Sequence, residues 1–70
     1  MKTKIDAQEE CAFILDTLAG KLPLDAFNGD WACFARYADM QAHAACNAGF
    51  SEIGNVMQAA SNRAARKVQA

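Results

Sequence analysis

Histidine and cysteine are the side chains of this sequence best suited to chemistry, and His43 and Cys46 stand three residues apart. On a helix that spacing places both side chains on one side, where they could bind one metal ion, with Cys11 or Cys33 as further ligands. Cys33 precedes His43 by ten residues, which puts it on another side of the same helix, and no second close pair completes a tetrahedral set. We therefore expect no metal site and no cofactor, and we interpret the cysteines as small, buried residues.

The same residue types could support nucleophilic catalysis. A nucleophilic cysteine needs a base, a third group that orients the base, and a pocket that encloses the substrate. Asp39 lies four residues before His43, and we interpret it as an intrahelical partner of the histidine rather than as half of a catalytic pair. The four glycines are dispersed instead of forming a phosphate-binding loop. We expect no enzymatic activity and no small-molecule substrate.

A different pattern could bind DNA, because Ala45 is followed four positions later by Gly49 and then by Ser51. A small residue and a glycine at this spacing allow two helices to cross at a tight turn, and the serine caps the next helix, so segment 45–67 resembles a helix-turn-helix motif. The candidate contacts to base edges are Glu52, Asn55, Gln58 and Asn62. The candidate contacts to phosphates are Arg63, Arg66 and Lys67.

Three departures weaken the DNA hypothesis. Glu52 would approach the phosphate-lined groove, and Gly54 would weaken the recognition helix. The chain has eight acidic and seven basic side chains, with a net charge of −1, so it lacks the positive charge that drives DNA binding. The basic residues near the end of the chain also suit the last turn of a helix through its dipole. DNA binding is therefore the alternative hypothesis.

A cluster of aromatic and basic residues favours protein binding. Five residues within eleven positions belong to types that dominate interface energetics: Phe27, Trp31, Phe34, Arg36 and Tyr37. A domain this small is not expected to enclose all four rings, so we expect at least one of them to face a second subunit or a target protein. We therefore favour a small intracellular regulatory or adaptor protein that acts through protein–protein interaction, as a homodimer.

The length of 70 residues indicates one small domain spanning residues 1–70. Although 53% of the residues are hydrophobic, sixteen of them are alanines, which bury little area each. The core is therefore expected to be thin, and contact with another subunit or partner should supply part of the stability.

Targeting and redox signals are weak. The three cysteines are an odd number without a CxxC pair, so a disulfide framework is not expected. No apolar run approaches the about 20 residues that a membrane span requires, and residues 1–4 lead into a mixed acidic segment rather than a signal-peptide core. We expect a reduced, cytoplasmic protein that does not bind membranes.

Helices must position all of these residues, because no period-two alternation persists. The first helix is expected to begin at Thr3 or Asp6 as N-cap and to end at Gly20. Its expected buried stripe consists of Ala7, Cys11, Ile14 and Leu18, widened by Leu15 and Leu22. Segment 21–30 carries the only proline and an Asn-Gly pair, which predict turns around one helical turn at 24–27.

The second helix is expected from Asp30, as N-cap, to about Asn47. It carries a stripe of mainly small residues at steps of four and three, here called the small-residue stripe. The stripe consists of Trp31, Ala35, Ala38, Ala42, Ala45 and Gly49. Because these side chains are mostly short, a partner helix can approach toward the short end of the usual range of about 8–10 Å between axes.

The hydrophobic pattern changes phase around residues 47–51. The next stripe comprises Cys46, Phe50, Ile53, Met57, Ala60 and Ala64. Gly49 at C′ and Ser51 as N-cap favour a tight connection over one long bent helix, with a third helix from Glu52 to about Val68. The expected fold is all-α: a helical hairpin of the second and third helices, covered by the first.

Overall fold

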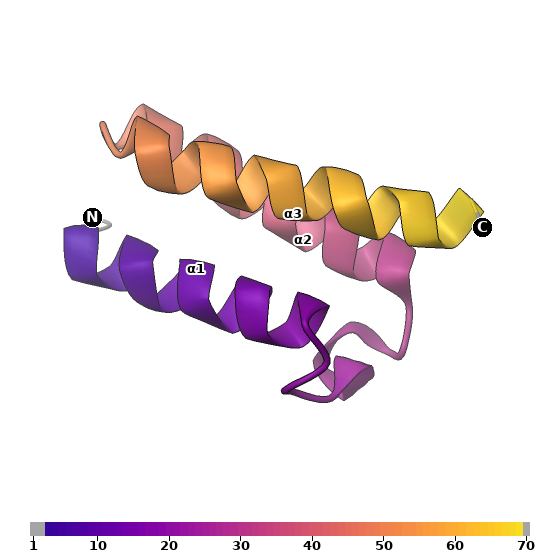
Figure 1. The fold of residues 1–70 in the computed structure, drawn as a ribbon. Helices are drawn as coiled ribbons and strands as arrows, with labels where there is room; N and C mark the ends of the chain where they lie inside the picture. Colours follow the sequence, from indigo (N-terminus) through magenta and orange to yellow (C-terminus); the bar gives the residue numbers. More distant parts are fainter. Residues whose placement is uncertain (1–2, 70) are drawn as a thin grey trace.

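A computed structural model describes residues 3–69 of the chain (Figure 1). It contains three α-helices and one 3-10 turn in the order α1 (Lys4–Leu18), η1 (Leu24–Phe27), α2 (Trp31–Asn47) and α3 (Ser51–Gln69). The expected all-α fold, a hairpin of the second and third helices covered by the first, is confirmed. Residues 1, 2 and 70, which the expected domain includes, lie outside the described part.

Helix α1 is capped at both ends, by side chains at its start and by the backbone at its end. The backbone N–H of Asp6 donates to Thr3 Oγ1 at 3.1 Å, and the N–H of Thr3 donates to Asp6 Oδ2 at 3.3 Å. Of the two expected N-caps, Thr3 is therefore the one used, with Asp6 completing a capping box. At the other end Gly20 has a φ of +84°, and the N–H of Lys21 donates to the carbonyl of Asp16 at 2.9 Å. This is a Schellman motif, as the glycine predicted.

The connection to α2 also follows local turn chemistry. Asn28 and Gly29 both have positive φ, at 58° and 66°, which turns the chain after η1. The carboxylate of Asp30 accepts the N–H of Ala32 at 2.9 Å, so Asp30 caps α2 as expected. The expected turn at 24–27 is present as η1, and it carries the buried ring of Phe27.

Helices α2 and α3 are joined by a tight turn, which confirms two helices instead of one bent helix. Gly49 has a φ of +94°, and the N–H of Phe50 donates to the carbonyl of Ala45 at 2.8 Å, a second Schellman motif. The first helical bond of α3 runs from the N–H of Gly54 to the carbonyl of Phe50 at 2.9 Å. Phe50 therefore takes the cap position, and α3 begins at Ser51, one residue earlier than expected.

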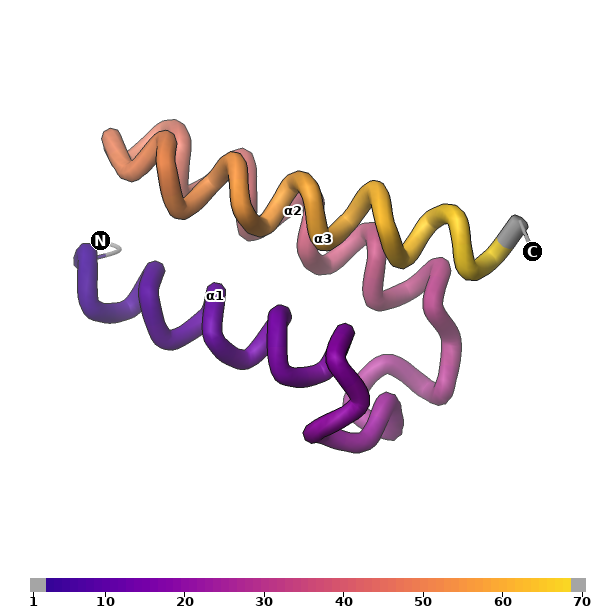
Figure 2. Tube along the Cα trace, in the orientation of Figure 1, coloured from indigo at the N-terminus to yellow at the C-terminus, as the bar shows by residue number. Residues whose placement is uncertain are grey.

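The hairpin packs through small residues. Helices α2 and α3 run antiparallel and make the most extensive contact between elements (Figures 1 and 2). Ala38, Ala42 and Ala45 of the small-residue stripe are buried. On α3 the hydroxyl of Ser61 donates to the carbonyl of Ala35 at 2.7 Å. A side chain that reaches the backbone of the facing helix in this way requires the close approach that the stripe predicted.

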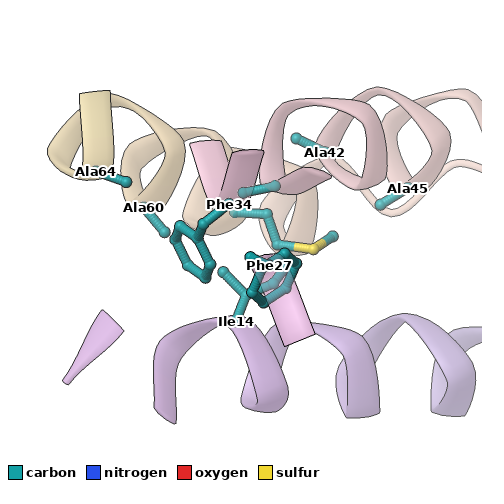
Figure 3. Close-up of a cluster of buried hydrophobic side chains, with 9 residues drawn as sticks. Ile14, Phe27, Phe34, Ala42, Ala45, Ala60 and Ala64 are labelled. Atoms are coloured by element: carbon teal, nitrogen blue, oxygen red, sulfur yellow. The ribbon is translucent and has the colours of Figure 1, made fainter. Parts of the chain in front are cut away.

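Helix α1 covers one side of the hairpin and lies mainly against α3, with fewer contacts to α2 (Figure 1). Its Ile14 is fully buried and points toward Phe27 and Phe34 (Figure 3). Thr17 is also buried, and its hydroxyl donates to the carbonyl of Phe13 at 2.9 Å, which satisfies its polar group within the helix.

The expected stripe of α1 needs one correction. Leu15 and Leu22 are 39% and 37% exposed instead of buried. Leu15 follows the buried Ile14 by one position, which rotates it by about 100° around the helix. Leu22 lies beyond the end of α1 at Leu18, so the helical spacing no longer directs its side chain. Apolar residues therefore remain on the outer side of α1.

Candidate protein interface

The five residues predicted to form a protein interface divide between core and surface. Phe34 and Phe27 are 0% and 5% exposed and belong to the core. Trp31 and Tyr37 are partly exposed, and Arg36 is exposed. The structure therefore removes two of the rings from any interface with a partner and leaves three residues at the surface.

Phe27 is buried because it is the centre of an aromatic cluster. Its ring centroid lies 5.2 Å from that of Phe34 and 5.2 Å from that of Tyr37. Phe13 of α1 adds a fourth ring at 5.9 Å. Spacings of about 4.5–7 Å with tilted or edge-to-face rings are favourable for aromatic pairs. The turn η1 thus inserts one ring between α1 and α2.

Trp31 is largely engaged within the protein. Its ring packs edge-to-face on Phe34, with centroids 5.4 Å apart. The Nζ atom of Lys67, near the end of α3, lies 5.2 Å from the centre of the Trp31 ring, which is within the range of a cation–π contact. A partner would have to displace Lys67 to reach this face of the indole.

Tyr37 borders a hollow between α1 and α2 that we call the acidic groove. Five residues line it: Asp6, Glu9, Glu10, Phe13 and Tyr37. The Phe13 and Tyr37 rings meet edge-on with centroids 6.4 Å apart and are partly buried, whereas Asp6 and Glu9 are exposed. The groove thus has the Phe13 and Tyr37 rings in its deeper part and the exposed carboxylates of Asp6 and Glu9 at its rim.

The groove exists because of how α1 is placed. Helices α1 and α2 both pack on α3 but make few contacts with each other, and the aromatic cluster bridges them near η1. Farther from η1, toward the start of α1, the bridging rings are absent and the carboxylates begin. None of the residues that line the groove is basic. The sequence analysis did not predict this site. The signal for it was Phe13, a large aromatic residue that directly precedes Ile14 of the buried stripe and lies outside that stripe.

A second, smaller hollow lies beside the turn between α2 and α3. It is lined by Lys4, Gly49, Phe50, Ser51, Glu52 and Ile53. Phe50 and Ile53 are partly buried and pack against the core. Their rings and methyl groups therefore serve mainly to close the end of the bundle.

The residues proposed to contact DNA lie on α3, and most are exposed: Asn55, Asn62, Arg63, Arg66 and Lys67. Gln58 is partly buried and donates to Asn62 Oδ1 at 3.5 Å. A helix-turn-helix requires its two helices to cross at about 90–120°, whereas α2 and α3 lie side by side as an antiparallel hairpin (Figure 2). The geometry therefore does not favour the DNA hypothesis.

The described cysteines do not form the metal site that was considered from the sequence. Within residues 3–69 no three histidine, cysteine or acidic side chains lie close enough to share a metal ion. The cysteines are free, and Cys46 is exposed while Cys11 and Cys33 are partly buried. Burial raises the pKa of the Cys11 thiol, which lowers the fraction present as the nucleophilic thiolate.

Two further observations bear on function. In the described part of the chain, every helix is too short or too polar to traverse a lipid bilayer. Comparison with protein-family models, with curated proteins and with solved structures finds no match. The function is therefore inferred from the geometry alone.

Proposed function

We propose that this protein is a small regulatory or adaptor protein that acts by binding another protein, and that the acidic groove is its docking surface. The observation that supports this most is the placement of α1 and α2, which both lie on α3 but make few contacts with each other. This placement leaves the Phe13 and Tyr37 rings partly exposed beside three carboxylates. Tyrosine is among the residues enriched at the energetic centres of interfaces.

A helix is the form of partner that suits this groove. Two helices that rest on a third leave the position that a fourth helix occupies in a four-helix bundle. An amphipathic helix can place its apolar side into such a groove through residues at positions i, i+3 or i+4, and i+7. The protein would then gain core area from its partner, which suits a domain with few large buried side chains.

The proposed homodimer uses a different surface. The outer side of α1 exposes Ile5, at 66%, and Leu15, at 39%, with Ala12 between them also exposed. A helix with apolar residues on both sides is usually covered on both sides. We therefore place the contact between subunits on the outer side of α1, away from the acidic groove.

An intracellular site of action is part of the proposal. The three free cysteines support it, because unpaired thiols are typical of reducing compartments. We propose no catalytic role, since the groove offers carboxylates at an open rim rather than a nucleophile beside a base.

Photo-crosslinking in living cells tests the docking surface directly. A photoreactive amino acid replaces Glu9, an exposed residue at the rim of the groove, in one variant. In the matched control it replaces Asn55, an exposed residue of α3 outside the groove. We expect a discrete adduct with another protein from position 9 and none from position 55. Adducts of equal yield from both positions, or none from position 9, would contradict the proposal.

A further inference from the structure

The acidic groove has a chemical polarity along its length. Asp6 and Glu10 are one turn apart, which separates them by about 6 Å along the axis of α1. Phe13 lies about 10 Å from Asp6 in the same direction. One end of the groove therefore carries carboxylates, and the other end, near η1, carries the Phe13 and Tyr37 rings.

The residues that line the groove carry negative charge and no positive charge. Three of its five lining residues are acidic and none is basic. Asp6 uses one oxygen to accept the N–H of Thr3, which holds its carboxylate at the start of α1. Electrostatic complementarity across an interface requires positive charge on the occupant, and the same carboxylates would repel the phosphates of nucleic acids or anionic lipids.

We propose that the occupant is a basic amphipathic helix of another protein, with lysine or arginine residues over the exposed carboxylates of Asp6 and Glu9 and an apolar residue against Phe13 and Tyr37. This inference rests on the proposed function of the groove and adds the chemistry of the partner. A cationic side chain near the boundary between the two ends would meet a carboxylate on one side and a ring on the other, and rings also attract cations. Basic residues spaced three or four positions apart match the spacing of the carboxylates on α1.

A panel of synthetic helices tests the charge of the occupant. Three peptides share one apolar stripe and carry lysine, glutamine or glutamate at the same flanking positions. Calorimetry measures affinity, and NMR of the labelled protein locates the contact. We expect the lysine peptide to bind about tenfold more tightly than the glutamine peptide, since several exposed ion pairs would add their individually small contributions. Shifts should concentrate at Phe13 and Tyr37, and the glutamate peptide should not bind.

Two variants with the same change in charge provide the matched control. Glu9→Gln removes one carboxylate from the rim, whereas Gln8→Lys adds one positive charge at an exposed neighbour that does not line the groove. At physiological salt, exposed charges more than about 8 Å apart are largely screened from each other. Glu9→Gln should therefore weaken the affinity for the lysine peptide two- to fivefold and leave the affinity for the glutamine peptide unchanged. Gln8→Lys should change either affinity less than twofold.

The outcomes separate the two proposals. Equal binding of the lysine and glutamine peptides at Phe13 and Tyr37 would overturn the basic partner and leave the groove as a docking surface. Absence of binding by every peptide would overturn both. Shifts of Phe13 and Tyr37 that depend on protein concentration without peptide would identify a second copy of this chain as the occupant, which would also overturn the basic partner.

Discussion

Gly54 on α3 faces the backbone carbonyl of Ala42 on α2 so closely that a Cβ atom at position 54 would lie 2.9 Å from that oxygen. The same Cβ would also collide with the Sγ atom of Cys46. The carbonyl belongs to a helix and cannot turn aside as a flexible side chain could. The two helices therefore reach their observed separation because residue 54 has no side chain.

Replacing Gly54 with alanine should destabilise the protein. Alanine favours helices over glycine by about 1 kcal/mol, yet overpacking at the contact with Ala42 should cost about 1–3 kcal/mol. We expect a net loss in the free energy of unfolding, measured by urea denaturation with circular dichroism. The matched control is Asn55→Ala at the next, exposed position, which should stay within about 0.5 kcal/mol of the original protein. A Gly54→Ala variant at least as stable as the original would show that the helices do not meet there.

Larger side chains in the small-residue stripe of α2 should also push α2 and α3 apart. Ala38 and Ala42 are 0% and 1% exposed, so leucine at either position has no space to enter. We expect Ala38→Leu and Ala42→Leu to lower the free energy of unfolding by roughly 1–3 kcal/mol. Ala59→Leu, at an exposed position of α3, serves as the control for helix propensity. Unchanged melting temperatures of both stripe variants would contradict the close packing of α2 on α3.

The sequence allowed the hairpin to be predicted because its signals are local. Asp30 caps α2 through its own side chain, and Gly20 and Gly49 end their helices with positive φ, as their residue types indicate. The stripe predicted burial of Ala38, Ala42 and Ala45 from spacing alone. Gly54 was considered only as a weak point of a helix, because its role depends on the backbone of the facing helix, which no local pattern contains.

The outer side of α1 gives a separate prediction about assembly. Leu15→Glu places a charge on the exposed apolar side and should shift the protein from dimer to monomer in sedimentation equilibrium. The melting temperature, compared at a concentration where both proteins are monomeric, should change little because Leu15 is 39% exposed. Asn55→Glu on α3 is the control and should leave the dimer intact. If the unsubstituted protein sediments as a monomer at every concentration, the proposed homodimer is wrong.

The thiols should differ in reactivity with pH. Burial raises the pKa of Cys11, so a smaller fraction of this thiol is deprotonated at neutral pH, and its alkylation should accelerate mainly in the alkaline range. Cys46 is exposed and should be alkylated faster than Cys11 at pH 7. Iodoacetamide labelling followed by mass spectrometry of the peptides gives both rates. Faster labelling of Cys11 than of Cys46 at pH 7 would contradict the partial burial of α1 against α3.

The candidate site was less predictable than the fold. Phe27, Trp31, Phe34, Arg36 and Tyr37 were grouped by residue type as a protein interface, and residue type could not separate Phe34 in the core from Tyr37 at the surface. That separation depends on η1, which brings Phe27 back between α1 and α2. The acidic groove depends on the packing of α1 mainly against α3 rather than against α2, which is a property of the tertiary structure.

An accessible pair of rings between α1 and α2 is the condition for the docking of another protein in the acidic groove. NMR with a soluble gadolinium chelate measures this accessibility directly, through the broadening of ring protons in a dilute sample. We predict strong broadening of the Tyr37 and Phe13 ring protons, which are partly exposed, and little broadening of Phe34, which is 0% exposed. Protection of Tyr37 and Phe13 equal to that of Phe34 would show that the groove is closed and would contradict the docking surface.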